Sequence, residues 1–117
     1  MFVIRKEMMA IFEVHMREQF VRKALAQIRE VFPDAAQKQG EPQLRALIES
    51  GIDKAAGFGV LSEREVLLFV DLMMELGPKF AEEPKYKWIG ATLEKSDLNE
   101  HQKMDIIYQR LEAASKA

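Results

Sequence analysis

The sequence predicts an all-α fold, a bundle of four to five helices in a single domain over residues 1–117. Apolar residues recur at spacings of three and four along most of the chain, which is the period of an amphipathic helix. Most glycines and prolines fall between these periodic segments, where helices end. With 48% apolar and 31% charged residues, a chain of 117 residues can bury a core without disulfides.

The first periodic segment runs from about Arg5 to Phe32 and predicts one long helix. Pro33 ends it, because a proline disfavours helical backbone at the residue before it. Its apolar stripe comprises Met9, Phe12, Met16, Phe20, Ala24, Ile28 and Val31. Such a stripe packs against the other helices of a bundle or forms the seam of an oligomer, so a homo-oligomer through the N-terminal helix stays open. The polar segment PDAAQKQGE that follows is expected to be a loop.

A second helix is expected to run to about Ala56, and Pro42 suits its first turn because the missing N–H has no partner there. Gly51 lies inside this helix, where glycine costs about 1 kcal/mol relative to alanine. We expect the close approach of a neighbouring helix to compensate for it. Gly57 and Gly59 are expected to supply the left-handed backbone that ends the helix.

The most apolar helix is expected over VLLFVDLMMEL, and it begins with the pattern of a capping box. In that motif the Ser62 hydroxyl accepts from the N–H of Glu65, and the Glu65 carboxylate bonds back to the N–H of Ser62. Only Asp71 and Glu75 are polar within the run, which predicts the central and most buried helix of the bundle. A Gly-Pro pair stops it.

Two shorter helices complete the prediction. An aromatic loop from Phe80 to Tyr86 leads to a short helix that contains Trp88. The last helix has several candidate N-caps around Ser96. Its apolar face is formed by Met104, Ile107, Tyr108 and Leu111.

Composition excludes several classes of function. The 17 basic and 19 acidic residues give a net charge of -2, whereas nucleic-acid binding would require a basic excess. The chain has no cysteine, which removes disulfides, thiolate catalysis and zinc–thiolate sites. No apolar run approaches the length of a membrane span, and the N-terminus lacks the apolar core of a signal peptide. We therefore expect a cytoplasmic protein that binds neither nucleic acid nor membrane.

The titratable residues offer only weak candidates for chemistry. His15 with Glu18, and His101 with Asp105, share helix faces that could contribute metal ligands. This spacing is common on charged helices, so solvated side chains are the favoured interpretation and no metal or cofactor is expected. Asp71 and Glu75 form a pair that could perform acid–base work if burial separated their pKa values. A solvent-facing edge or pairing with a basic residue is favoured for them.

The residues that best suit partner binding are methionines and aromatics of the central helix and the loop after it. Adjacent methionines can line an adaptable groove, although core filling is their commoner role. Aromatics in a loop either seal the end of a bundle or anchor a partner, and sealing is favoured for Trp88. The predicted partner-binding residues are Met73, Met74, Phe80, Tyr86 and Trp88.

One pattern resembles a known family. Its residues are Gly51-Ile52, Ala55-Ala56, Gly59, Ser62-Glu63, Leu72-Met73, Gly77-Pro78, Phe80, Pro84, Trp88, Met104-Asp105 and Tyr108. Over about the last two-thirds of the chain this pattern is similar to small helical proteins encoded in bacterial type VI secretion effector loci, beside a PAAR spike protein, an effector and an adaptor chaperone. The resemblance implies a non-enzymatic co-chaperone that assists in loading the effector, with the adaptor or the effector as its protein partner.

Three other functions stay open. An immunity protein that inhibits a cognate toxin would also be a partner-binding bundle, and neutralisation of the co-expressed toxin would identify it. A small enzyme using Asp71, Glu75 and one histidine would require a cleft around those carboxylates. A structural homodimer would pair through the first helix, and its mass in solution would show it.

Overall fold

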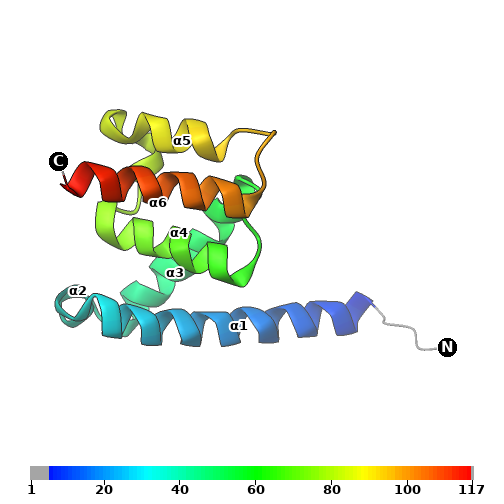
Figure 1. Ribbon diagram of the computed structural model, residues 1–117. Helices are drawn as coiled ribbons and strands as arrows, with labels where there is room; N and C mark the ends of the chain where they lie inside the picture. The colour runs from blue at the N-terminus through cyan, green and yellow to red at the C-terminus, as the bar shows by residue number, and fades with distance from the viewer. Residues whose placement is uncertain (1–5, 117) are drawn as a thin grey trace. The chain divides into compact units, whose positions relative to one another are not determined.

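The computed structural model describes the backbone of residues 6–116 and the side chains of residues 13–115. Over this range the secondary structure is helical and includes no strand, which confirms the all-α prediction (Figure 1). The helices are α1 (Lys6–Val31), α2 (Pro33–Lys38), α3 (Glu41–Gly57), α4 (Glu63–Leu76), α5 (Lys87–Leu93) and α6 (Glu100–Lys116), with 3₁₀ turns η1 (Phe80–Glu82) and η2 (Pro84–Tyr86). No helix within the described range has both the length and the hydropathy needed to cross a membrane.

The backbone divides into two compact units, residues 1–48 and residues 49–117. The boundary falls inside α3, so each unit contains one part of that helix. We describe each unit separately, and the single-domain prediction for residues 1–117 stays a prediction.

The N-terminal unit consists of α1, α2 and the first part of α3. Its buried apolar side chains come from one face of α1 and one face of α3. They are Val21, Ala24, Leu25 and Ile28 of α1, and Leu44 and Ile48 of α3. A salt bridge connects α1 to α3, because the Arg45 Nη2 atom lies 2.6 Å from both carboxylate oxygens of Glu18. The hydrogen bond from Arg45 is the main reason why the pKa of Glu18 is lowered from its ordinary value.

The predicted stripe of α1 is buried in part. Ala24 and Ile28 are buried, whereas Met16 is 46% exposed and Val31 is 55% exposed. The side chains of Met9 and Phe12 lie outside the described residues. An oligomer seam on this helix stays a prediction.

A short helix occupies part of the segment that was expected to be a loop. α2 covers Pro33–Lys38, with proline in its first turn, Asp34 near its N-terminus and Lys38 in its last turn. Proline is pre-organised for a first helical turn, and the two charges complement the helix dipole. The described residues therefore form six α-helices rather than four to five. The segment lacks an apolar period because none of its residues is buried.

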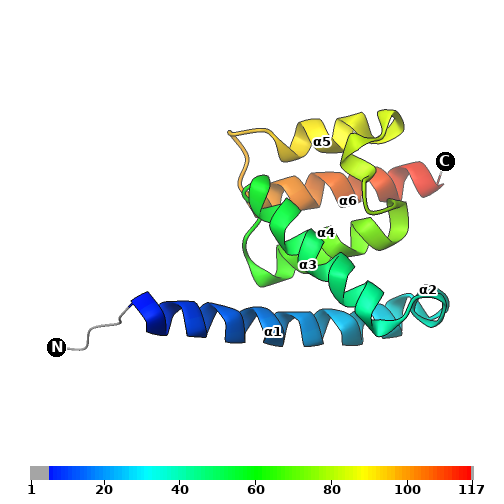
Figure 2. The same ribbon diagram turned by 180° about the vertical axis from the view of Figure 1, so that it is seen from behind.

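The C-terminal unit contains the rest of α3, then α4, the two 3₁₀ turns, α5 and α6. Figures 1 and 2 both show α5 beside α6, and these helices contact one another. The apolar core of the unit comprises Ala55, Val60, Val66, Phe69, Val70, Leu72, Met73, Phe80, Ile89, Leu93, Met104 and Ile107. α4 contributes five of these side chains, while Leu67, Leu68 and Met74 on the same helix are half-buried.

Two glycines with positive φ end the helices of this unit. Gly59 has φ of 78° just after α3, and Gly77 has φ of 109° at the C-cap of α4. These values confirm the predicted role of Gly59 and the predicted stop at Gly77. Gly57 was expected to share this role but is the last residue of α3. The buried Lys103 of α6 donates from Nζ to the Phe58 carbonyl at 3.0 Å, which satisfies an acceptor beyond the end of α3.

The predicted capping box is not formed at the start of α4. The Ser62 hydroxyl makes no hydrogen bond to the helix backbone and instead contacts Glu65 Oε2 at 2.5 Å and Glu100 Oε1 at 2.6 Å. Glu100 Oε1 also accepts from the N–H groups of Ser62, at 2.7 Å, and Leu61, at 3.1 Å. The carboxylate that accepts from the Ser62 N–H therefore comes from α6, while Glu65 accepts from the side chains of Ser62, His101 and Arg64.

Gly51 lies at a close approach of α3 to α4, as predicted. A Cβ atom at this position would lie 2.9 Å from Val70 Cγ2 and 3.0 Å from Met73 Sδ. Both neighbours are buried, and valine is stiff, so the added methyl group would force its closely packed surroundings to shift.

We predict that Gly51→Ala lowers the free energy of unfolding by about 1 kcal/mol, because overpacking outweighs the gain in helix propensity. The matched control is Gly57→Ala, since a Cβ there meets nothing within 4 Å. That control is expected to raise the free energy of unfolding by about 0.5 kcal/mol. Urea unfolding measures both values. An equal stabilisation by both variants would show that α3 and α4 do not approach closely.

Candidate partner-binding pocket

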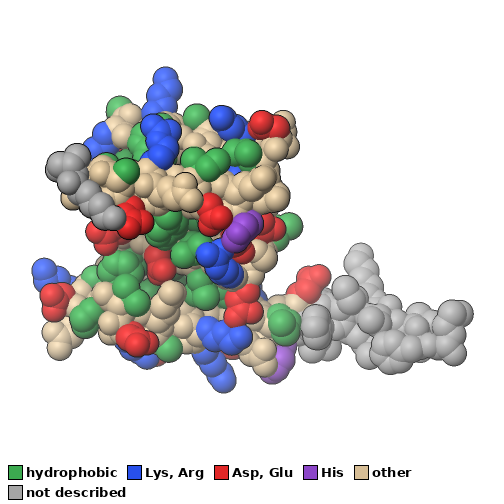
Figure 3. Space-filling model, in the orientation of Figure 1, with side chains coloured by type: hydrophobic (Ala, Val, Ile, Leu, Met, Phe, Trp, Pro, Cys, Tyr) green, Lys and Arg blue, Asp and Glu red, His purple; other side chains and the backbone are tan. Residues whose placement is uncertain are grey.

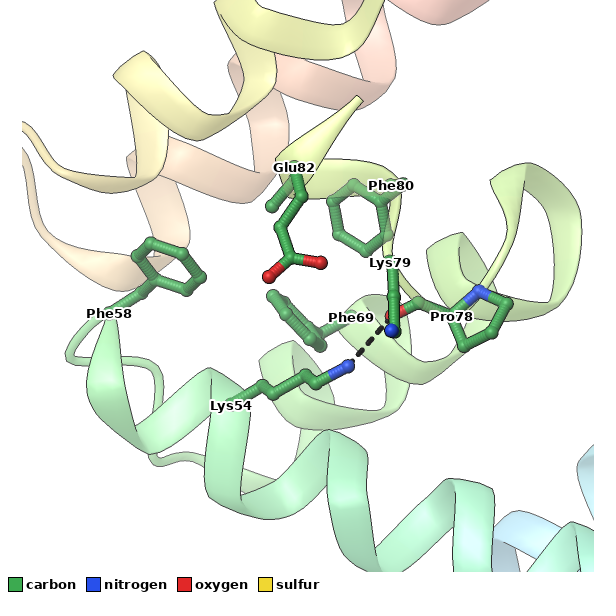
Figure 4. Close-up of a pocket in the computed structure, with 8 residues that line it drawn as sticks. Lys54, Phe58, Phe69, Pro78, Lys79, Phe80 and Glu82 are labelled. Carbon is green, nitrogen blue, oxygen red and sulfur yellow. Dashed lines mark hydrogen bonds between the residues drawn. The ribbon is translucent and has the colours of Figure 1, made fainter. Parts of the chain in front are cut away.

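An apolar pocket opens in the C-terminal unit, between the end of α3, α4 and the turn η1 (Figure 4). Its volume is about 150 Å³. We call it the Phe58 pocket, and its lining residues are Lys54, Phe58, Phe69, Pro78, Lys79, Phe80, Ala81 and Glu82.

Three phenylalanines from three different elements form its apolar surface. Phe58 follows α3 and is half-buried, while Phe69 of α4 and Phe80 of η1 are each 1% exposed. The Phe69 ring centroid lies 6.2 Å from that of Phe58 and 5.3 Å from that of Phe80, with tilted planes. These separations are typical of favourable aromatic pairs. Phe69 and Phe80 therefore give the pocket a fixed base, and Phe58 gives it a wall that solvent can reach.

The backbone positions these rings through the two helix ends. The chain turns at Gly59 directly after Phe58, and the Gly77-Pro78 stop directs the chain from α4 into η1, where Phe80 is the first residue. Lys54 Nζ donates to the Pro78 carbonyl at 2.9 Å, which connects α3 to this turn. The pocket therefore depends on the same residues that end α3 and α4.

The lining of the pocket is mostly apolar. It consists of aromatic and aliphatic surface with Lys54, Lys79 and Glu82, all exposed, as its charged side chains. These eight residues include no hydroxyl, imidazole or thiol that could act as a nucleophile or proton shuttle. A small apolar cavity with a few polar groups at its mouth is the usual form of a site that holds an apolar group.

The structure brings one of the five predicted partner-binding residues into this pocket. Phe80 lines it, but as a buried part of its base. Met73 is 1% exposed and packs against Gly51, so its side chain fills the core in this conformation. Met74 is half-buried on α4. Direct contact of Met73 or Phe80 with a partner would therefore need a rearrangement, and their role in binding stays a prediction.

The other two predicted residues lie outside the pocket lining. Tyr86 is half-buried, and Lys85 Nζ lies 5.0 Å from its ring centroid. Trp88 is half-buried on α5, with the Arg110 guanidinium of α6 at 4.2 Å from its ring centroid. A cation over an aromatic face is attractive, so Arg110 holds α6 against α5 at this ring. Trp88 thus takes part in helix packing, and a binding role for both rings stays a prediction.

A second group of polar and charged side chains gathers where α4 and α6 begin. Basic, acidic and histidine side chains lie together on this surface (Figure 3). The buried Glu65 carboxylate is 2.6 Å from Arg64 Nη1 and 3.0 Å from His101 Nδ1 through Oε1. Hydrogen bonds, first from Ser62 and then from His101, lower the pKa of Glu65 to about 2.

The histidine and carboxylate candidates for chemistry have different surroundings. His101 contacts Glu65, and its Nε2 lies 3.3 Å from Asp105 Oδ2, so the predicted shared face is formed. Burial raises the pKa of Asp71 to about 6, whereas Glu75 is exposed. Within the described residues, no group of three or more histidine and acidic side chains is placed to hold a metal ion.

Tyr108 lies near Asp71 and Glu75, whose charges act on its hydroxyl. Its hydroxyl donates to the Leu68 carbonyl at 2.6 Å, which ties α6 to α4. Burial raises the pKa of Tyr108, and the negative charges of Asp71 and Glu75 raise it further. The tyrosine therefore stays protonated and acts as a structural donor.

Sequence reasoning did not find most of the pocket. The predicted partner-binding residues include Phe80 but not Phe58, Lys54 or Phe69. An aromatic flanked by glycines at a helix end was the available signal, because such a residue has no helical neighbours to cover it.

Over the described residues the fold is all-α, and an apolar pocket opens in its C-terminal unit. Comparison with protein-family models, curated proteins and solved structures finds no match to the chain.

Proposed function

We propose that this chain is a non-enzymatic protein-binding helper that holds an apolar side chain of a partner protein in the Phe58 pocket. The observation that supports this proposal most directly is the pocket itself. Its aromatic base is already buried and ordered by packing, so a partner residue would meet a preformed surface. Preformed sites bind more tightly because little ordering entropy remains to be lost.

The size of the pocket suits a single anchor. Full burial of one large apolar side chain contributes about 1.5–3 kcal/mol, and interfaces concentrate their energy in a few such anchors. The exposed lysines and glutamate at the mouth would form the polar rim of that interface.

The particular role that we propose follows the resemblance of the segment from Gly51 to Tyr108. In that role the protein is a cytoplasmic co-chaperone of a type VI secretion locus, and its partner is the adaptor chaperone or the effector. The proposal needs only a partner-binding surface and no cofactor, and the Phe58 pocket offers such a surface.

Co-purification tests this proposal. The tagged chain is expressed together with the proteins encoded beside it, and the complex mass is measured by light scattering. We expect an adaptor or effector in defined stoichiometry, and Phe58→Ala should weaken its binding roughly tenfold because the pocket loses its wall. Leu61→Ala is the matched control, since Leu61 is apolar and 71% exposed but does not line the pocket.

Equal binding by the Phe58→Ala and Leu61→Ala variants would show that the pocket is not the interface. Recovery of the chain alone as a stable dimer would contradict the helper role and favour the structural homodimer. Recovery of a toxin whose activity the chain abolishes would favour the immunity protein.

A further inference from the structure

The mouth of the Phe58 pocket is charged asymmetrically. Lys54 and Lys79 lie along the edge at Pro78, and the Glu82 carboxylate lies on the other side of the Phe69 ring (Figure 4). All three side chains are exposed, so they would keep most of their hydration when a ligand contacts them. A bound group would therefore meet an apolar base, a cationic edge and an anionic edge.

Lys54 is already oriented at the cationic edge. Its Nζ donates one hydrogen bond to the Pro78 carbonyl at 2.9 Å. A lysine ammonium has three N–H donors, so two remain for a ligand. Because this hydrogen bond directs the ammonium toward the turn before η1, Lys54 and the neighbouring Lys79 define a position that suits a carboxylate.

The pocket has room for only one ring. Its volume is about 150 Å³. An apolar cavity of roughly this volume accepts a molecule of the size of benzene. A carboxylate attached close to the ring that fills the pocket would reach the lysines at its edge. In a polypeptide, the shortest link between an aromatic ring and a carboxylate occurs in a phenylalanine at the C-terminus.

Resting on the proposed function, we infer that the partner is anchored through a C-terminal phenylalanine. Its ring fills the Phe58 pocket, and its α-carboxylate accepts hydrogen bonds from Lys54 and Lys79. The backbone N–H of that phenylalanine then faces the opposite edge of the pocket, where the Glu82 carboxylate can accept a hydrogen bond from it. Charge-assisted hydrogen bonds of this kind fix orientation as well as adding affinity.

Matched peptides test the inference with the full chain. A fluorescent hexapeptide of glycine and serine that ends in phenylalanine is compared, as the free acid, with the same peptide amidated at its C-terminus. We expect the free acid to bind with a Kd roughly tenfold lower than the amide, and a peptide ending in alanine to bind far more weakly than either. The difference between acid and amide should shrink at about 0.5 M salt, because exposed charges are screened.

Two variants test whether the preference for the free acid depends on a lysine at the mouth of the pocket. Lys79→Gln should weaken the free acid roughly threefold to fivefold and leave the amide unchanged, as expected for one exposed charge pair. Lys95→Gln removes the same charge from an exposed residue outside the pocket lining and should change neither peptide. Circular dichroism confirms that the variants remain folded.

Equal affinity for acid and amide would overturn the carboxylate assignment. Failure of both peptides to bind, while Phe58→Ala still weakens the natural partner, would overturn the C-terminal anchor and leave the proposed function standing. If Phe58→Ala has no effect on the partner but the free acid binds selectively, the pocket recognises a C-terminal phenylalanine, but the proposed function fails and the partner is not anchored there.

Discussion

Phe80→Ala is expected to lower the free energy of unfolding by about 3–5 kcal/mol, which is the range for truncating a buried phenylalanine. Phe80 is 1% exposed and packs against Phe69 with ring centroids 5.3 Å apart. The change removes transfer energy and leaves a cavity beneath the pocket. Total stabilities of natural domains are about 5–15 kcal/mol, so much of the stability would be lost. Urea unfolding at neutral pH measures it.

The control for this change is Tyr86→Ala in the same loop. Tyr86 is half-buried and its ring contacts Lys85, so its truncation should leave the protein folded. Both aromatics were predicted to bind a partner, a role that a residue can lose without unfolding the protein. A smaller shift of the urea midpoint for Phe80→Ala than for Tyr86→Ala would show that Phe80 is not a core residue.

Glu65→Gln is expected to lower the free energy of unfolding by about 2–3 kcal/mol at pH 7, because charged hydrogen bonds to a buried carboxylate are lost. Glu65 is buried and accepts from Ser62, His101 and Arg64. Its pKa falls from 4.5 to about 2 on folding. A lowered carboxyl pKa contributes stability that is fully present above pH 4.5 and lost as the pH falls toward 2.

The pH dependence separates this effect from simple loss of packing. The difference in unfolding free energy between wild type and Glu65→Gln should shrink between pH 4.5 and pH 2. Glu94→Gln changes an exposed glutamate and should shift stability by less than about 0.5 kcal/mol at any pH. If the difference in unfolding free energy between wild type and Glu65→Gln is constant over this range, the hydrogen bonds to Glu65 do not stabilise its ionised form.

The long helices were predictable because their apolar period and their Gly and Pro boundaries are local signals. The start of α1 was expected at Arg5, outside the described residues, and its predicted end at Phe32 lies one residue beyond Val31. α2 was missed because PDAAQK buries no side chain and so has no period to detect. The close approach at Gly51 was inferred correctly, since a glycine inside a helix requires a packing reason.

The candidate site was less accessible to sequence reasoning because it depends on contacts between distant residues. Phe58, Phe69 and Phe80 meet only after α3 and α4 have packed, and nothing in the spacing of these residues predicts that meeting. The pattern around Ser62 was misinterpreted for the same reason. Its capping carboxylate belongs to Glu100, which is 38 residues away in the chain.

The remote cap at Ser62 has a consequence for the order in which the chain can fold during synthesis. The first N–H groups of most helices find their partners within a few residues, so such helices can form as soon as they leave the ribosome. The N–H groups of Leu61 and Ser62 wait for the Glu100 carboxylate, which is made only after α4 and α5. The hydrogen bonds of the two residues before α4 are therefore completed only after the start of α6 has been synthesised.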